Sequence, residues 1–476
     1  MLETKMSGND NIRISYDFPS AWEGLSPEEN SEVFNFSEDY KKFLDKCKTE
    51  IKCNKEIVKF AEEHNFINLK DILNNKIKII PGMKIYSNNR DKNVILLNIG
   101  TEKIEDGINI VGTHIDSPRL DIKPFPLYED SELALLKTHY YGGIKKYQWT
   151  SIPLSLHGVI YKKNNEKVEI EIGEDNNDPV FFISDLLPHL AQEQLSKKLS
   201  DGISGEELNI IVGNIPTKNN DLKENVKHNI LKIIHSKYGI DESDFAVAEL
   251  KAVPAEKARD VGFDRSLVVG YGQDDRACAY ASLRAITELQ NPMKTCVGVF
   301  CDKEEIGSVG NTGMSSSFFE YTLAEVIMLC NENYSELTLK RSLLKSRVLS
   351  GDVFPSFDPS FPEVHDRRNA PYLGKGLSVI KYTGMRGKSG ANDAHAHFLS
   401  ELRTVLNKNN IKWQLGEIGK VDQGGGGTIA YIFANYGAEV VDCGIPLLSM
   451  HAPYELISKV DIYMAYKGYK CFLLEI

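Results

Sequence analysis

Short apolar runs that alternate with helical patterns are the feature that most constrains this sequence. The runs lie at residues 94–99, 108–111, 295–301, 347–350 and 439–443. Runs of this length are typical of strands that are buried on both faces. Helical patterns follow them at residues 275–289, 397–406 and 456–474. Strands that alternate with helices predict an α/β fold, a mostly parallel sheet with helices on both faces.

The pattern changes from α/β to antiparallel β between residues 124 and 255. Residues 155–160 and 168–172 are apolar and flank a lysine-rich polar stretch, which predicts a hairpin. We therefore expect residues 124–255 to form an inserted, antiparallel β-rich domain with helical pieces. Residues 1–123 and 256–476 are expected to form one α/β domain around it.

The N-terminal region is predicted to be mostly helical over its first 80 residues. Ser37 is expected to cap one of these helices, because Glu38 and Asp39 are acidic residues that suit a helix N-terminus. Apolar residues then recur at helical spacing.

Composition and charge limit the partners and the location. The net charge of −11 argues against a nucleic acid or an anionic membrane as partner. No run of 18 apolar residues is present, and residues 1–19 are too polar for a signal peptide. The eight cysteines form no Cys-x-x-Cys pair, which is typical of free thiols in a reducing compartment. We therefore expect a cytoplasmic protein.

The first candidate site segment is residues 112–119, GTHIDSPR, directly after an apolar run. At the end of a strand, residues two apart point the same way, so His114 and Asp116 project together. This suits a metal-binding imidazole whose other ring nitrogen is held by a carboxylate. A structural His–Asp pair is the alternative.

The second and third segments carry paired carboxylates. Asp274 and Asp275 open a helical pattern; capping explains one aspartate, and the other can bridge two cations. Glu304 and Glu305 follow the apolar run that ends at residue 301. One glutamate can bind metal while the other, with its pKa pulled towards neutral, takes a proton from water. An acidic surface loop is the alternative.

Two further segments place Asp352 and His451 after apolar runs. Each is weak alone, but together these residues form a mixed imidazole and carboxylate set. Such ligands suit zinc, and the carboxylates make cobalt or manganese possible. Two divalent cations in one site need a shared anion, and Asp274 suits that role.

These five segments resemble the dinuclear-zinc aminopeptidases of the aspartyl aminopeptidase and aminopeptidase I family, in the same order and over nearly the whole chain. The most specific motifs are His-x-Asp-Ser-Pro and Asp-x-Glu-Glu-x-Gly-Ser. The resemblance implies these metal ligands: His114, Asp274, Glu305, Asp352 and His451. It also implies that Asp274 bridges the cations, that Glu304 is the general base and that Asp116 supports the first histidine.

The resemblance extends to assembly and substrate binding. It implies that residues 124–255 form a dimerisation domain and that subunits build a large homo-oligomer, a dodecamer. His189 matches a histidine that reaches a neighbouring subunit's active site, with a structural histidine as the alternative. Lys381 and Gly426 match positions near the substrate site. A surface lysine and a flexible glycine loop are the alternatives.

The segment after Asp352 departs from the eukaryotic aspartyl enzymes, which carry a histidine there. Here Val353, Phe354 and Pro355 follow, as in the bacterial aminopeptidase I branch. An acidic and a neutral N-terminal residue both remain possible as the preferred substrate end.

The sequence therefore predicts a metalloaminopeptidase that removes N-terminal residues from peptides, with water bridging two divalent cations and Glu304 as base. Two alternatives remain. The first is another dinuclear hydrolase, such as a deacylase, carboxypeptidase or glucanase. The second is a non-catalytic, metal-stabilised assembly, against which the adjacent Glu304 and Glu305 argue, since a structural site needs no spare base.

Overall fold

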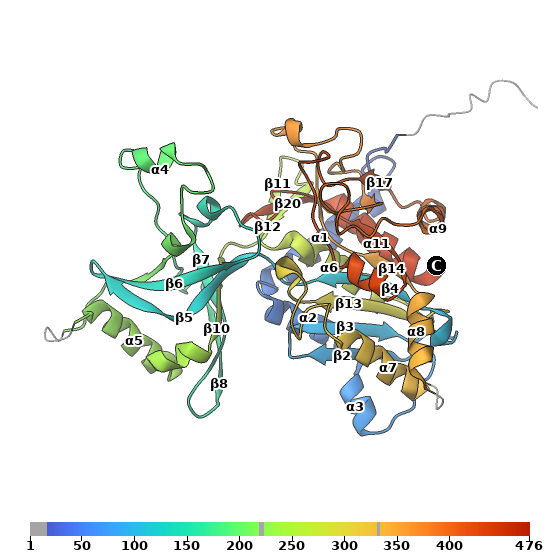
Figure 1. Cartoon of the computed structure of the whole chain (residues 1–476), viewed down its shortest axis with the longest axis horizontal. Helices are drawn as coiled ribbons and strands as arrows, with labels where there is room; N and C mark the ends of the chain where they lie inside the picture. Colours follow the sequence, from blue (N-terminus) through green and yellow to red (C-terminus); the bar gives the residue numbers. More distant parts are fainter. Residues whose placement is uncertain (1–16, 219–222, 331–333) are drawn as a thin grey trace, which may run out of the picture.

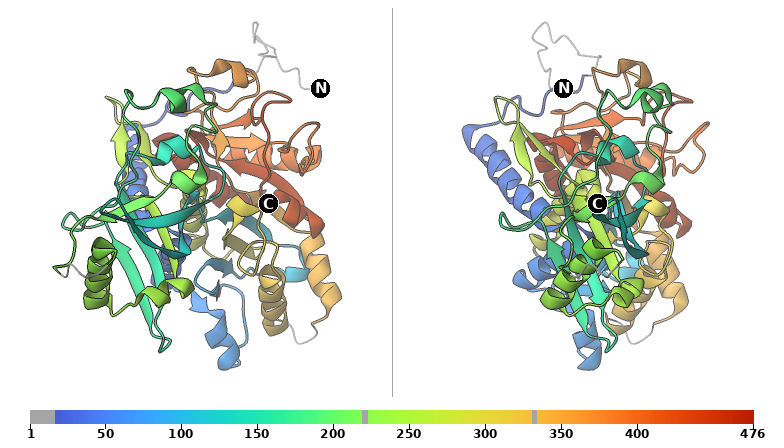
Figure 2. Two further views of the ribbon diagram at one scale, coloured as in Figure 1. Left: turned by 60° about the vertical axis from the view of Figure 1, so that its left-hand side comes forward. Right: turned by 90° about the vertical axis from the view of Figure 1, so that its left-hand side faces the viewer.

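The computed structural model describes residues 17–218, 223–330 and 334–476. Figure 1 shows two lobes, a larger one built on the main sheet and a smaller antiparallel one beside it. In the right-hand view of Figure 2, the smaller lobe lies in front of the larger one.

A nine-stranded sheet forms the centre of the larger lobe within the described residues. In spatial order its strands are β1 (Ile67–Asn68), β2 (Lys84–Asn89), β3 (Asn93–Asn98), β13 (Cys296–Cys301), β4 (Asn109–His114), β14 (Arg347–Ser350), β18 (Glu439–Gly444), β16 (Leu377–Ile380) and β17 (Trp413–Gly416). Five of its eight described strand pairs are parallel. The other three pairs are antiparallel. The prediction of a mostly parallel sheet is confirmed.

Helices cover both faces of this sheet, as predicted. The apolar core on one face is shared with α1 (Pro27–Lys46), α2 (Glu50–Glu63), α6 (Gln273–Thr287), α9 (Ala396–Lys408) and α11 (Lys459–Glu475). The core on the other face is shared with α3 (Leu69–Asn74), α7 (Phe318–Cys330), α8 (Glu336–Leu344) and α10 (Ala430–Asn435). Central strands such as β3 and β4 are buried along their whole length, which explains their continuous apolar runs.

The smaller lobe is a six-stranded sheet in which every described pair is antiparallel. In spatial order its strands are β8 (Lys167–Ile172), β7 (Leu154–Tyr161), β10 (Glu249–Pro254), β5 (Arg119–Asp130), β6 (Leu133–Tyr141) and β9 (Ile210–Gly213). The helices of this part of the chain are α4 (Gln192–Ser196) and α5 (Asn225–Tyr238). The predicted hairpin is β7–β8. The division at residues 124 and 255 stays a prediction, and β5 begins slightly before it.

A third, five-stranded sheet is built from two strands that precede α6 and three strands that follow β14 or β18. Its strands are β11 (Arg259–Val261), β12 (Leu267–Gly270), β20 (Glu455–Ser458), β19 (Pro446–Leu448) and β15 (Phe354–Pro355). Short 3-10 helices are η1 (Ile104–Asp106), η2 (Lys146–Trp149), η3 (Gly205–Glu207), η4 (Glu242–Val247), η5 (Glu304–Ile306) and η6 (Pro362–Val364). In the described part of the chain, no helix combines the length and apolar character needed to cross a bilayer.

Two predicted helix starts are wrong. Helix α1 does not begin after Ser37, because Ser26 and Glu29 form a capping box eleven residues earlier. Ser37 lies buried inside α1, where its hydroxyl donates to the carbonyl of Val33. The last helix does not begin at residue 456, because residues 455–458 pair as β20 with β12 and β19.

Candidate metal centre

Two groups of possible metal ligands meet at one carboxylate among the described residues. His114, Asp274 and Asp352 form the first group, and Asp274, Glu305 and His451 form the second. Within each group, the ligand atoms lie within 4.8 Å of one another. These are the five residues that the sequence singled out, and Asp274 is the one they share.

The first group is arranged around one ring nitrogen of His114. His114 Nε2 lies 3.2 Å from Asp274 Oδ1 and 3.7 Å from Asp352 Oδ1. Glu304 Oε2 lies 4.0 Å from the same nitrogen. His114 and Asp274 are almost fully buried, whereas the Asp352 and Glu304 side chains keep 13% and 17% exposure. One side of this group is therefore open to solvent.

The second group mirrors the first across Asp274. His451 Nε2 lies 3.2 Å from Asp274 Oδ2 and 3.5 Å from Glu305 Oε2. The two oxygens of Asp274 thus face the two histidines separately. A carboxylate placed in this way can bind one cation with each oxygen.

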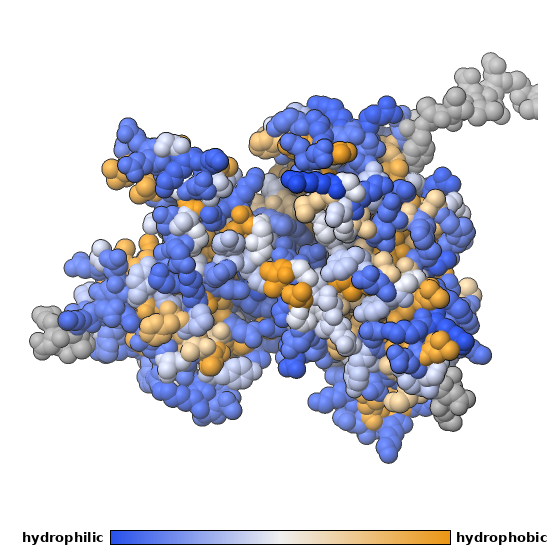
Figure 3. Space-filling model, in the orientation of Figure 1, coloured by the Kyte–Doolittle hydropathy of each residue, from blue (hydrophilic) through white to orange (hydrophobic). Residues whose placement is uncertain are grey.

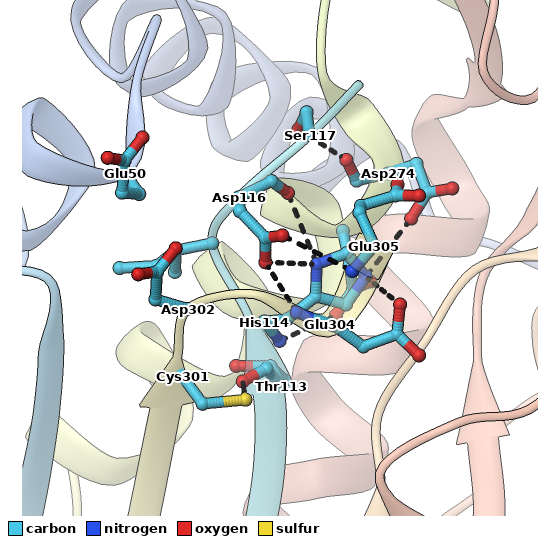
Figure 4. Close-up of polar contacts among 12 residues, drawn as sticks. Glu50, Thr113, His114, Asp116, Ser117, Asp274, Cys301, Asp302, Glu304 and Glu305 are labelled. Carbon is cyan, nitrogen blue, oxygen red and sulfur yellow. Dashed lines mark hydrogen bonds and ion pairs between the residues drawn. The ribbon is translucent and has the colours of Figure 1, made fainter. Parts of the chain in front are cut away.

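The topology brings these residues together. Strands β4, β13, β14 and β18 run parallel, so their carboxyl ends lie at one edge of the sheet. His114 is the last residue of β4, Glu304 and Glu305 follow β13, and Asp352 follows β14. Figure 4 shows His114, Asp274, Glu304 and Glu305 converging at this edge.

Asp274 and His451 come from the third sheet's connections. Asp274 lies in the first turn of α6, shortly after β12, but its φ of −81° and ψ of 106° are outside the helical region. Its carboxylate faces the two histidines, so the capping alternative does not describe it. Its backbone NH and that of His451 both donate to the buried carboxylate of Glu455, at 3.0 and 2.9 Å. Glu455 therefore ties together the backbones that present both groups.

Asp116 supports the site from behind His114. Its Oδ1 lies 3.3 Å from His114 Nδ1, and its backbone carbonyl lies 3.1 Å from the same nitrogen. Its carboxylate also accepts hydrogen bonds from the backbone NH groups of Glu304 and Glu305, at 3.1 and 3.2 Å. Asp116 is fully buried, as a supporting residue of a metal-binding histidine requires.

The electrostatics of the site favour positive charge where the ligands meet. Burial acts to lower the pKa of His114, but Asp116, Asp274 and Asp352 raise it well above its ordinary value. Burial also acts to lower the pKa of His451, but Asp274 and Glu305 raise this pKa to about 10. Burial and neighbouring carboxylates raise the pKa of Glu304 to about 8. A divalent cation would relieve this concentration of carboxylates.

The donor set fits divalent cations. Imidazole nitrogens and carboxylate oxygens are the ligands that zinc, cobalt and manganese share. Among the described residues, Glu305 Oε1 is buried without a hydrogen-bond partner. A buried carboxylate oxygen without a partner is costly unless a cation or water binds it.

Lys381 lies directly after β16, and Gly426 lies on the loop between β17 and α10. Lys381 is exposed and forms an ion pair with Asp393 at 3.3 Å. The carbonyl of Gly426 accepts a hydrogen bond from Gly384, and a Cβ at Gly426 would meet no described atom within 4 Å. By contrast, a Cβ at Gly424 would lie 1.8 Å from a carbonyl oxygen. Packing thus explains the glycine at 424 and leaves open space at 426.

His189 is exposed in the smaller lobe, where it lines a surface hollow with Asp185 and Gln194. In the described part of the chain, no hydrogen bond or ion pair joins it to the five ligand residues. Helix α4 follows it and lies away from the main sheet in Figure 1. A single chain therefore does not place His189 in its own site.

Sequence reasoning named Asp116 but missed three other residues that contact the candidate ligands or their supports. Tyr141 donates to Asp116 at 2.8 Å, and the Gly143 carbonyl lies 2.8 Å from His451 Nδ1. Glu455 was also missed. None of these three residues belongs to a sequence motif, so their roles are visible only from their contacts in the structure.

Comparisons with known proteins agree over nearly the whole chain. A family model described as Aminopeptidase I zinc metalloprotease (M18) matches residues 43–473. A curated Probable M18 family aminopeptidase 1 from Clostridium acetobutylicum is 54% identical over 457 residues, covering 96% of this chain and 98% of that protein. One from Thermotoga maritima is 47% identical over 442 residues, covering 93% and 96%.

Solved structures show the same fold. The crystal structure of an M18 family aminopeptidase from Thermotoga maritima matches with a TM-score of 0.93 at 45% identity, covering 97% of this chain and all of that one. The crystal structure of aminopeptidase I from Clostridium acetobutylicum matches with a TM-score of 0.91 at 50% identity and the same coverage.

The fold, the relatives and the family model together define a zinc metalloprotease. The chain belongs to the M18 family, the aminopeptidase I family, and it is an aminopeptidase, a hydrolase that acts on the end of a peptide. The family match favours this reading over a deacylase, a carboxypeptidase, a glucanase or a non-catalytic assembly.

Proposed function

We propose that this aminopeptidase uses two divalent cations to remove single N-terminal residues from peptides. Zinc is the first candidate for these cations, followed by cobalt and manganese. The two ligand groups that share Asp274 are the observation that carries this proposal. His114 and Asp352 would hold one cation, Glu305 and His451 the other, and Asp274 both. Cations held there would supply the positive charge that polarises a water molecule and the scissile carbonyl.

Glu304 is proposed as the general base. Its carboxylate stands at the open side of the first group, close to His114 and partly exposed. It can therefore take a proton from water and pass it to the leaving amine. Asp116 does not touch substrate in this scheme; it keeps His114 oriented through Nδ1.

Lys381 and Gly426 are proposed to contact the peptide. Open space beside Gly426 leaves room for a substrate backbone close to the loop. The residues after Asp352 offer no charge for an acidic side chain, since Val353 and Phe354 are buried and apolar. A neutral N-terminal residue is therefore as good a candidate as an acidic one.

An assay with aminoacyl amides and short peptides tests this function. The zinc- or cobalt-loaded protein should release N-terminal residues, and a chelated control should not. The panel should include acidic and neutral N-terminal residues, N-acylated peptides and carboxyl-terminal substrates. Release from the carboxyl end, or from acylated peptides alone, would contradict the proposal.

We also propose that the chain self-associates through residues 124–255 into a dimer-based homo-oligomer, a dodecamer. Five exposed leucines in this region support an interface: Leu186, Leu187, Leu190, Leu195 and Leu199. Orange patches over the α4 region in Figure 3 show apolar surface there. A solved S. cerevisiae mApe1 structure is a dodecamer. Leu190→Asp with Leu195→Asp should reduce the mass measured by light scattering, and an unchanged mass would contradict this interface.

His189 is proposed to act in the site of a neighbouring subunit. Its exposure in the smaller lobe, away from its own ligands, supports this role. Co-expressed His189→Ala and Glu304→Gln subunits should recover part of the activity, because mixed oligomers contain complete sites. No recovery in verified mixed oligomers would contradict the role.

We propose a cytoplasmic location as well. All eight cysteines are free thiols, six of them buried. Free thiols persist in a reducing compartment. Fractionation of the source cells tests this proposal.

A further inference from the structure

The end of β6 reaches the candidate metal centre, although β6 belongs to the smaller lobe. Tyr141, the last residue of β6, and the next two residues, Gly142 and Gly143, are called the 141–143 segment below. The Tyr141 hydroxyl donates to Asp116 Oδ2 at 2.8 Å. Two residues later, the Gly143 carbonyl lies 2.8 Å from His451 Nδ1. One short segment therefore reaches the support of the first histidine and the second histidine itself.

The Tyr141 contact fixes the Asp116 carboxylate. That carboxylate faces His114 Nδ1 with one oxygen, and the tyrosine hydroxyl reaches the other. The Tyr141 ring is held in turn by the Arg119 guanidinium, whose carbon lies 3.7 Å from the ring centroid. Arg119 is buried and forms ion pairs with Asp121 and Glu50. The hydroxyl is thus held at a fixed place under Asp116.

The Gly143 contact fixes the other histidine. With Nδ1 donating to the Gly143 carbonyl, the opposite nitrogen of His451 faces Asp274 and Glu305. A hydrogen bond at the non-ligating nitrogen sets both the tautomer and the ring orientation of a metal-binding histidine.

Gly142 lets the segment pass this close. Its φ of +73° is unfavourable for residues with a Cβ. A Cβ there would also lie 3.3 Å from Glu305 Oε2 and 3.3 Å from Pro118 Cγ. Both the backbone conformation and the limited space beside Glu305 therefore favour glycine.

We propose that the 141–143 segment is a positioning element that orients both histidine ligands, so that the antiparallel sheet is part of each cation site. Tyr141 acts on the first group through Asp116, and Gly143 acts on the second group directly. The proposal rests on the two-cation function proposed above. It assigns no contact with substrate to these residues.

Cobalt titration of the full-length protein tests the Tyr141 arm. Cobalt bound by histidine and carboxylate has a visible absorption band, so binding is followed without any turnover. Tyr141→Phe keeps the ring and removes the hydroxyl. It should weaken cobalt binding at one of the two sites by roughly 10–100-fold. Tyr140→Phe is the matched control, because Tyr140 is the neighbouring tyrosine of the same strand and is exposed; it should bind like wild type.

Gly142→Ala tests the other arm. The added methyl group should weaken the second cobalt site and leave the first closer to wild type. Gly24→Ala is the control, since Gly24 has a similar φ of +80° and a Cβ there meets nothing within 4 Å. It carries the same backbone cost without crowding a ligand.

The melting temperature of the cation-free protein separates positioning from folding. Weaker cobalt binding by a variant whose cation-free form melts like wild type supports the proposal. Wild-type cobalt affinity in both Tyr141→Phe and Gly142→Ala would overturn it, even if peptidase activity is found. Conversely, a wild-type protein that binds two cobalt ions and cuts no peptide would overturn the proposed function and leave the cobalt comparison standing.

Discussion

His114 in the main sheet and His157 in the antiparallel sheet are both buried histidines that face a carboxylate. Their surroundings differ in the number of carboxylates. His157 Nε2 lies 2.9 Å from Glu174 Oε1 and 3.0 Å from the Ser155 hydroxyl. Four carboxylates surround His114: Asp116, Asp274, Glu304 and Asp352.

The pKa values of the two histidines move in opposite directions. Burial lowers the pKa of His157, and its partner Glu174 does not overcome this effect. Burial also acts on His114, but its carboxylates raise the pKa well above the ordinary value. A buried His–carboxylate pair is therefore not enough to mark a cation site. Several carboxylates converging on one imidazole nitrogen make the difference.

Removing the Asp274 carboxylate should reduce the contrast between the surroundings of His114 and His157, and we expect this change to have the largest effect on activity. Asp274→Asn is expected to lose both cations and bring turnover below detection, because each group loses a charged ligand. Cation content by elemental analysis and an aminoacyl-amide assay check this. Retention of one tightly bound cation would show that the groups do not depend on a common ligand.

Glu304→Gln should separate cation binding from chemistry. We expect two cations to remain bound while turnover falls roughly 10²–10⁴-fold, the usual contribution of a general base. Steady-state kinetics on the loaded variant measure the loss. Near-normal turnover would remove Glu304 as the base.

Cation removal should destabilise the protein, because the carboxylates around Asp274 lose their counter-charge. At a free cation concentration of 1,000 times Kd, binding stabilises the folded state by about 4 kcal/mol. Calorimetry with and without chelator should show a melting temperature several degrees lower without cations. The His157→Gln variant should show the same difference, since His157 belongs to no ligand group.

His157→Gln should give the smallest effect, on the pH dependence of stability. The folded-state pKa of His157 lies below its unfolded value of about 6.5, so the unfolded state binds more protons. This group therefore makes wild-type stability fall as pH drops from 7 to 5, by at most about 1.4 kcal/mol per pH unit. Urea unfolding at several pH values should show a flatter profile for the variant. An equal slope would mean that folding does not shift the pKa of His157.

The main strands could be predicted because their environment is uniform. Strands β3, β4 and β13 are buried at every position, so each is a continuous apolar run that sequence alone reveals. The candidate ligand residues could be grouped from the sequence because parallel strands end at one edge of the sheet. Strands β4 and β13 are parallel neighbours, so His114 at the end of β4 and Glu305 after β13 come together.

The supporting contacts could not be predicted in this way. Tyr141 ends a strand of another sheet, and nothing in its neighbours distinguishes it from Tyr140. Glu455 lies in β20, which reads in sequence as the first turn of the last helix. Ser37 does not cap a helix, because Ser26 and Glu29 form a capping box that starts α1 earlier in the chain. The sequence alone does not show which serine begins the helix.

The distance along the chain between the two histidines has a consequence for synthesis. A ribosome makes His114 early and His451 late, and the roughly 340 residues between them take about 20–70 s at 5–20 residues per second. During that time the first ligand group lacks its counterpart, and Glu455 is not there to join their backbones. The nascent chain therefore has no complete candidate metal centre until its synthesis is nearly finished.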